Sequence, residues 1–209
     1  TPRSHYDFLL KTGKDSSYTG ITEQWRTEYF LTKIKGKVLN IGALKNSFTN
    51  YVFGKGYELD IVNVDLINWN DKRTNHNYVV ADGYMLPFKR KSFDSVLMGE
   101  TLEHLIDPEV VLEEVIRVLT IHGRLIGSTP CIGRTEKTHV VDFYSKKDLI
   151  NLLVPYFYSI NVIQHSPFWL FECSNWVRKE NKSDHGDVEP VEARFNLGID
   201  LLSVRNVDY

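Results

Sequence analysis

Four side chains in the middle of the chain have the types and spacing needed for proton transfer. Glu100, Glu103 and His104 lie within five residues of one another, and His139 opens a later segment, HVVDFYS. Histidine titrates near neutral pH and can therefore take a proton from a hydroxyl group, while a neighbouring carboxylate orients it. We predict His104, His139 and Glu103 as catalytic residues. The alternative for each histidine is a structural role in a loop.

The residues on either side of this cluster predict the elements that position it. Residues 93–98 form a largely apolar run that stops at Gly99, which is typical of a central strand covered on both faces. Residues 108–119 repeat apolar side chains at helical spacing behind Pro108. Because ligands bind at the carboxyl ends of strands in open parallel sheets, the cluster is expected at the functional edge.

The remaining pattern alternates strands with helices. Further helices are expected at 22–33, for one or two turns within 43–58, and at 145–154, where Ser145 is the predicted cap. Gly123 is expected to end the helix that starts at Pro108. The other strands are expected at 37–41, 59–65, 78–81, 124–128, 159–164 and 199–204. This order predicts a doubly wound α/β fold.

Polar residues also follow the first three predicted strands. Asn40-Ile41-Gly42 ends the first, Asp65 ends the second, and Asp82 follows the third. Asp65 lies 25 residues after Asn40, near the spacing at which an acidic side chain accepts hydrogen bonds from a ribose diol. An acid at position 82 could accept from a purine amine. Together these positions predict a groove shaped for a nucleoside.

Several segments resemble the class I S-adenosylmethionine-dependent methyltransferases, of the methyltransferase type 11 kind. The resemblance covers residues 37–153 and is carried by VLNIGALKNS, NVDL, ADGYMLPFKRKSFDSVLMGETLEHLIDP and GRLIGSTP. It implies a Rossmann-like, seven-stranded, mostly parallel sheet with an antiparallel final strand, and S-adenosyl-L-methionine as cofactor. The positions that match the family's cofactor site are Asn40, Gly42 and Ala43 for the methionine part, Asp65 and Leu66 for the ribose, Asp82, Gly83 and Tyr84 for the adenine, and Gly99 and Glu100 beside them.

The resemblance implies in-line methyl transfer, with an oxygen of a small molecule or a glycan end as the expected acceptor. One alternative is a metal-assisted hydroxyl methyltransferase: Glu100, Glu103, His104 and His139 resemble the metal ligands of small-RNA 2′-O-methyltransferases. The main interpretation includes no metal. A second alternative is a binding module without catalysis, because Leu44 and Asn46 stand where the family has glycines. A dinucleotide-binding oxidoreductase is disfavoured because GALKN lacks the GxGxxG pattern.

Composition limits the partners and the compartment. The 209 residues carry a net charge of −2, so the broad positive field of a nucleic-acid binder is missing and nucleic acid is an unlikely partner. No apolar run is long enough to span a membrane, and the two cysteines have no metal-site spacing, so we expect a cytoplasmic protein. The pattern says nothing about oligomeric state.

The chain is predicted to divide into two parts. Residues 1–35 are expected to form an N-terminal arm and helix, and residues 36–209 the methyltransferase domain. Residues 165–197 are expected to carry acceptor-side elements and, in the polar run 181–190, a mobile loop. The dense aromatic residues of SPFWLFECSNW fit either core packing or an acceptor pocket.

Overall fold

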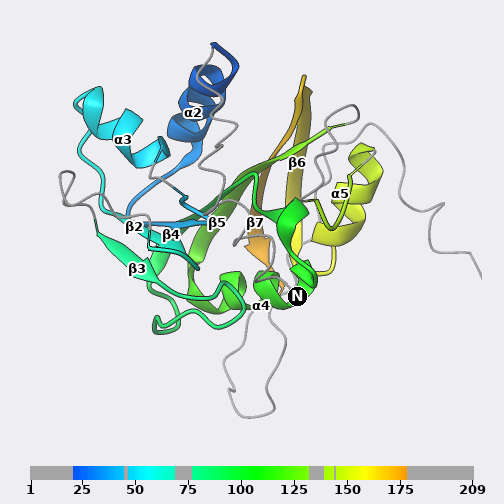
Figure 1. Cartoon of the computed structure of the whole chain (residues 1–209). Coiled ribbons are helices and arrows are strands. Elements are labelled where there is room, and N and C mark those ends of the chain that lie inside the picture. The colour runs from blue at the N-terminus through cyan, green and yellow to red at the C-terminus, as the bar shows by residue number, and fades with distance from the viewer. Residues whose placement is uncertain (1–20, 45–46, 69–76, 132–138, 144, 178–209) are drawn as a thin grey trace, which may run out of the picture.

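The computed structural model describes residues 21–44, 47–68, 77–131, 139–143 and 145–177, which form one mixed sheet covered by helices on both faces (Figure 1). The strand order is β3-β2-β1-β4-β5-β7-β6. Strands β1 to β5 pair in parallel, and β7 is antiparallel to both its neighbours. The strands are β1 (Val38–Ile41), β2 (Ile61–Asp65), β3 (Tyr78–Val80), β4 (Phe93–Gly99), β5 (Leu119–Pro130), β6 (Phe157–His165) and β7 (Phe168–Trp176). The predicted seven-stranded, mostly parallel sheet with an antiparallel last strand is therefore confirmed.

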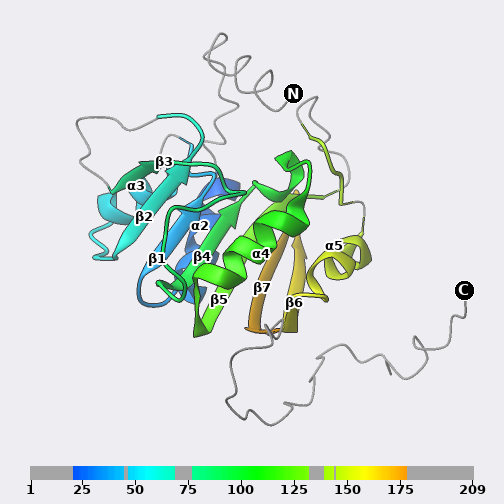
Figure 2. The ribbon, with the colours of Figure 1, turned by 90° about the horizontal axis from the view of Figure 1, so that it is seen from below.

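Two helices cover each face of the sheet. Figures 1 and 2 show α2 (Ile21–Lys33) and α3 (Ser47–Gly54) on one side, and α4 (Pro108–Val118) and α5 (Lys146–Leu153) on the other. Phe30 and Val52 pack with Leu97 in one core cluster, and Leu112 packs with Met98 in a second, larger one. Successive residues of β4 therefore feed opposite layers of the core, which explains why its sequence is apolar on both faces.

The central strand and the helix that follows it form as their sequence predicts. Strand β4 is paired on both edges, and α4 buries Val111, Leu112, Val115 and Val118 behind Pro108 in its first turn. Between them the chain forms a short 3₁₀ helix, η1 (Leu102–His104), which the sequence pattern does not predict. The predicted cap of α5 is also confirmed, because Ser145 and Asp148 form a reciprocal capping box.

The predicted end of the helix that starts at Pro108 is wrong. Helix α4 ends at Val118 and β5 begins directly at Leu119, so Gly123 lies inside the strand instead of ending the helix. The pairing explains this: Leu119 faces Phe93 but Arg124 faces Ser95, so residues 120–123 form an irregular excursion within the strand. Strand β7 was not predicted from the sequence; its Phe168, Leu170 and Phe171 are fully buried between β5 and β6.

Some predictions fall on other parts of the chain. The N-terminal arm before residue 21, Asn46, the polar run 181–190 and the segment 199–204 lie outside the described residues. Among the helices of the described ranges, none combines the length and the apolar character needed to cross a bilayer.

Candidate functional site

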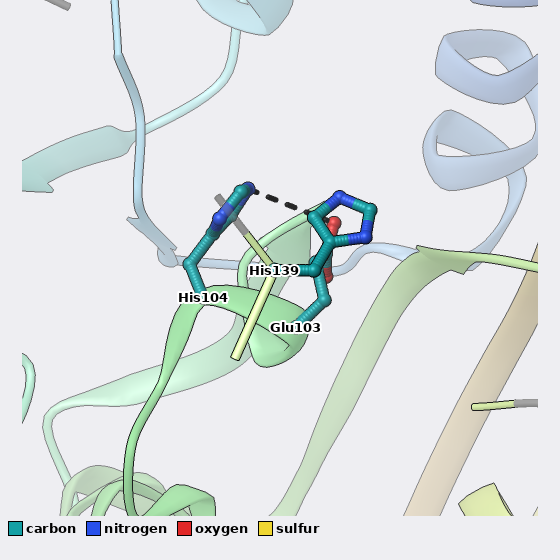
Figure 3. Close-up of side chains that lie close together, drawn as sticks. All are labelled: Glu103, His104 and His139. Carbon is teal, nitrogen blue, oxygen red and sulfur yellow. Dashed lines mark ion pairs between the residues drawn. The ribbon is translucent and has the colours of Figure 1, made fainter. Parts of the chain in front are cut away.

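Glu103, His104 and His139 meet at the carboxyl end of β4 (Figure 3). Glu103 is 1% exposed, and its Oε2 accepts a hydrogen bond from Thr129 Oγ1 at 3.2 Å. Its Oε1 lies 4.0 Å from His104 Nε2 and has no hydrogen-bond partner within the described residues. The two imidazole rings lie 5.3 Å apart, and one ligand atom from each of the three side chains fits within 4.8 Å of the others.

Backbone hydrogen bonds bring His139 to this place from a distant segment. The carbonyl oxygen of Glu103 accepts from the amides of Val140 and Val141 at 2.8 and 3.2 Å. His139 Nδ1 lies 3.4 Å from Asp142 Oδ1, so a carboxylate faces one ring nitrogen. Asp142 was not among the predicted site residues, although its position three residues after His139 in HVVDFYS was the available signal.

The environment of Glu103 keeps its carboxyl group protonated near neutral pH. Burial and, to a smaller extent, the nearby Glu100 carboxylate together raise its pKa to about 8, against the lowering effect of hydrogen bonds and of Arg26. The group can therefore donate a hydrogen bond at pH 7. A base placed beside it can take its proton, and a cation placed there would favour release of that proton to solvent.

Glu100 faces away from this cluster, toward α2. Its backbone has a φ of 52°, and its Oε1 lies 3.2 Å from Arg26 Nη1. Arg26 is buried, donates to Ser128 Oγ at 3.3 Å, and lies over the ring of Phe168 at 4.9 Å. Of the four residues expected to act together, the structure thus brings three into one cluster and places Glu100 in an ion pair. Arg26 was not predicted, because a single arginine in an amphipathic helix usually lies on its solvated face.

The end of β1 forms a tight turn. Gly42 has a φ of 71°, and the amides of Gly42 and Ala43 both donate to the carbonyl of Val64, at 2.9 and 3.1 Å. A Cβ at Gly42 would lie 2.5 Å from Thr101 Oγ1, so only glycine fits there. Asn40 is buried, and its Nδ2 donates to Asn63 Oδ1 at 2.9 Å, so this amide group is held in the core beneath the turn.

Asp65 connects the loops after β1 and β2. Its Oδ2 accepts from the amide of Leu44 at 2.9 Å, and its Oδ1 accepts from the amide of Ile67 at 3.1 Å. Leu44 itself has a φ of 46°, in the left-handed region that glycine normally occupies. A carboxylate oxygen has two lone pairs, so each Asp65 oxygen can also accept from a ribose hydroxyl. Leu66, next to it, is 41% exposed.

The loop after β3 is fastened to the loop after β4. Asp82 is exposed and accepts from the amide of Tyr84 at 3.0 Å, with Gly83 half-buried between them. The hydroxyl of Tyr84 accepts from the amides of Ile106 and Asp107, at 2.9 and 3.0 Å. The residues predicted for the cofactor therefore follow the ends of four neighbouring parallel strands, and their donors and acceptors fit a nucleoside cofactor.

Part of the chain matches a known protein family. The family model described as a methyltransferase domain matches residues 39–127. No curated protein matches the chain in sequence.

Solved structures resemble the fold at low sequence identity. The 1,6-didemethyltoxoflavin-N1-methyltransferase of Burkholderia thailandensis, solved with 1,6-didemethyltoxoflavin and S-adenosylhomocysteine, is 16% identical with a TM-score of 0.64, over 82% of this chain and 86% of that one. A possible histamine N-methyltransferase of Thermotoga maritima is 16% identical with a TM-score of 0.62, over 82% and 99%. Geranyl diphosphate C-methyltransferase of Streptomyces coelicolor, solved with Mg²⁺, geranyl diphosphate and S-adenosyl-L-homocysteine, is 10% identical with a TM-score of 0.57, over 73% and 80%.

These proteins are described as acting at nitrogen and at carbon, so the fold does not fix the acceptor atom. The fold class and the family resemblance predicted from the sequence are confirmed. Residues 39–127 match the model of a methyltransferase domain, and the described residues have the fold of solved S-adenosylmethionine-dependent methyltransferases.

Proposed function

We propose that the protein transfers the methyl group of S-adenosylmethionine to an oxygen atom of a small molecule or a glycan end. The observation that carries this proposal is the convergence of Glu103, His104 and His139 at the end of β4, beside the positions expected to hold the cofactor. Methyl transfer to oxygen needs a group that removes the hydroxyl proton, and the cluster supplies two imidazoles and a carboxyl group for that purpose.

Different residues of the chain would bind the cofactor and transfer the proton. When bound, S-adenosylmethionine supplies an electrophilic methyl group, so the protein chiefly provides proximity and alignment. Asp65 would hold the ribose, with Leu66 beside it, and the loop 82–84 would hold the adenine. His104, whose side chain is 25% exposed, is the base that the acceptor reaches first. Asp142 faces Nδ1 of His139 and so leaves Nε2 for the acceptor side, where the protonated Glu103 would donate a hydrogen bond to the bound acceptor.

Cofactor binding and methyl transfer test this proposal separately. Calorimetry with S-adenosylmethionine and S-adenosylhomocysteine is expected to show binding that Asp65→Ala weakens by about 1.5 to 3 kcal/mol. His104→Ala is expected to lower turnover more than cofactor affinity, whereas His122→Ala, an exposed histidine on β5, serves as the matched control. No binding at millimolar cofactor would overturn the enzyme interpretation in favour of a binding module.

A second candidate is metal-assisted methylation of a hydroxyl group. Glu103 supports it, because a fully buried carboxyl oxygen without a hydrogen-bond partner lies within reach of two imidazoles. Glu103, His104 and His139 would then hold a divalent cation, with Glu100 left in its ion pair with Arg26. EDTA distinguishes the candidates: turnover that survives the chelator excludes the metal, and turnover restored by Mg²⁺ or Mn²⁺ after its loss supports it.

The expected surroundings of the enzyme belong to the same proposal. Both cysteines, Cys131 and Cys173, are buried free thiols, which suits a reducing compartment such as the cytoplasm. The net charge of −2 favours small-molecule acceptors over nucleic acid.

A further inference from the structure

We propose that the acceptor is amphipathic, with a hydroxyl-bearing head that reaches Glu103 and an apolar tail that lies on Met85, Ile106 and Val140. We name these three side chains the apolar rim; they are 78%, 58% and 54% exposed. The inference rests on the proposed function, because it specifies the substrate class of the same site.

Each rim residue belongs to a segment that builds the site. Ile106 stands two residues after His104, and its amide donates to the hydroxyl of Tyr84 at 2.9 Å. Met85 directly follows Tyr84, and its own amide donates to the carbonyl of Asp82 at 3.0 Å. Val140 directly follows His139, and its amide donates to the carbonyl of Glu103 at 2.8 Å. Three segments distant in sequence are therefore fastened to one another around the cluster.

The route to Glu103 passes the rim. The Glu103 and His139 side chains are only 2% and 6% exposed, whereas the His104 side chain is 25% exposed. An acceptor must therefore approach the cluster along His104. Ile106 and Val140 stand next to that approach, because one follows His104 closely in the chain and the other is bonded to Glu103 beside it.

The three side chains of the apolar rim do not contribute to the packing of the core. In the same three segments Leu86, Leu105 and Val141 turn inward and pack against the core. Their neighbours Met85, Ile106 and Val140 are exposed to solvent. Hydration of each of these large apolar side chains is unfavourable until another group covers it. Methionine, the most exposed of the three, is the side chain that adapts most readily to the shape of a ligand.

Charge favours a free molecule over a membrane surface as the occupant. Asp82 lies in the same loop as Met85, and Asp107 and Glu109 follow Ile106; all three acids are exposed. An anionic bilayer would be repelled by these carboxylates. These carboxylates would not repel the neutral tail of a single acceptor molecule. Such a tail also needs no apolar surface larger than the rim.

Two homologous probe series test the proposal by binding, so that no turnover is needed. n-Alkyl β-glucosides and p-alkylphenols, from methyl to octyl and below their micelle concentrations, are titrated by calorimetry into the protein saturated with S-adenosylhomocysteine. Affinity is expected to rise about two- to fourfold for each added CH₂ group until the rim is covered. The triple variant Met85→Ser, Ile106→Ser, Val140→Ser is expected to lose this dependence. The matched control Ile121→Ser, Val154→Ser, which removes exposed apolar side chains elsewhere, is expected to keep it.

Equal affinity along both series, or an undiminished slope in the triple variant, would overturn the inference. It would also be overturned if the wild-type chain is a dimer by light scattering and the triple variant a monomer, since a second copy would then cover the rim. Failure of the proposed function looks different: S-adenosylhomocysteine and S-adenosylmethionine would not bind, or no probe that binds would accept a labelled methyl group.

Discussion

Glu103 shows how burial determines what a carboxyl group can do. The side chain lies on a short 3₁₀ helix and is buried, with one oxygen accepting from Thr129 and the other 4.0 Å from His104 Nε2. Burial and Glu100 together raise its pKa to about 8, so the neutral form is stable at physiological pH. The charge of Glu103 therefore depends on what binds beside it.

This raised pKa predicts how stability depends on pH. The unfolded chain loses the Glu103 proton near pH 4.5 and the folded chain near pH 8, so the folded state binds the extra proton between these values and stability falls as pH rises through that window. Glu103→Gln removes this loss while keeping an oxygen for Thr129. At pH 9 the variant is expected to be about 2 to 4 kcal/mol more stable than the wild type, and at pH 4 nearly equal to it. Urea unfolding at both pH values measures this, and equal differences at the two pH values would contradict it.

Asp142 gives a second prediction at the scale of one residue. Asp142→Ala removes the carboxylate that faces His139 Nδ1 at 3.4 Å. Turnover at saturating cofactor is expected to fall about 10- to 100-fold, because the imidazole loses its preferred orientation and tautomer. Asp142→Asn keeps an oxygen and should recover part of the loss. The dissociation constant of S-adenosylhomocysteine, measured by calorimetry, should not change in either variant; a matching loss of cofactor affinity would indicate general damage.

Residue types and spacing predicted part of the site. The ExxEH pattern and the later His139 identified three side chains that do meet. Glu103 and His104 were predictable because they follow the end of one strand, and His139 because it opens the segment HVVDFYS. Arg26 and the direction of Glu100 could not be predicted, since they depend on which face of α2 is turned to the sheet. No local pattern in the sequence specifies that contact between α2 and the end of β4.

At the scale of elements, the hydroxyl of Tyr84 joins the loop after β3 to the link between η1 and α4. It accepts from two successive backbone amides, those of Ile106 and Asp107, just after the segment that carries Glu103 and His104. Both amides directly precede the first residue of α4, Pro108, so the tyrosine fixes the entry of the chain into that helix. The loop after β3 and the link between η1 and α4 are thus held in one arrangement.

Tyr84→Phe tests this connection. Loss of the shared acceptor is expected to loosen η1 and to lower turnover about three- to tenfold at saturating cofactor, in line with about 1 kcal/mol for a hydrogen bond. Tyr78→Phe is the matched control: Tyr78 lies on β3, and its hydroxyl also bonds a loop backbone, the carbonyl of Ile67 at 2.7 Å, but far from η1 along the chain. Equal turnover losses in the two variants would show that the Tyr84 contact has no special role.

Strands and helices were predictable where each had a consistent local pattern. Strand β4, helix α4 and the Ser145 cap follow from apolar runs, helical spacing and a capping residue. Strand β7 was not predicted from the sequence, because an inner strand covered on both faces lacks the alternation of polar and apolar residues. Its aromatic residues were equally consistent with the lining of an acceptor pocket. Gly123 was misinterpreted for a different reason: it lies in the irregular part of β5, where a Cβ would lie 2.9 Å from Leu119 Cδ2 and from the carbonyl oxygen of Thr120.

At the scale of the whole molecule, α2 is part of the sheet's packing. Phe30 and Ile34 lie in a core cluster with Leu97 and Ile126, and Lys33 pairs with Glu172 of β7 at 3.0 Å. The division into residues 1–35 and 36–209 stays a prediction, and the packing supplies a way to test it.

Phe30→Ala provides that test. Phe30 is 3% exposed, so its truncation is expected to destabilise the protein by about 3 to 5 kcal/mol. If α2 and the sheet unfold together, Trp fluorescence, which includes Trp25 on α2, and far-ultraviolet circular dichroism will give the same urea midpoint before and after the substitution. Two separated transitions, with only the first shifted in the variant, would instead show that the N-terminal part unfolds independently.

The left-handed backbone of Leu44 has a consequence for how such a chain can diverge. A leucine held at φ 46° costs about 1 to 2 kcal/mol relative to an unstrained residue. Replacement by glycine would remove that strain but give the unfolded chain more conformational freedom, worth about 0.4 to 1 kcal/mol in the opposite direction. The two effects largely cancel, so folding exerts little selection at this position. A lineage could therefore gain or lose the glycine without passing through an unstable intermediate.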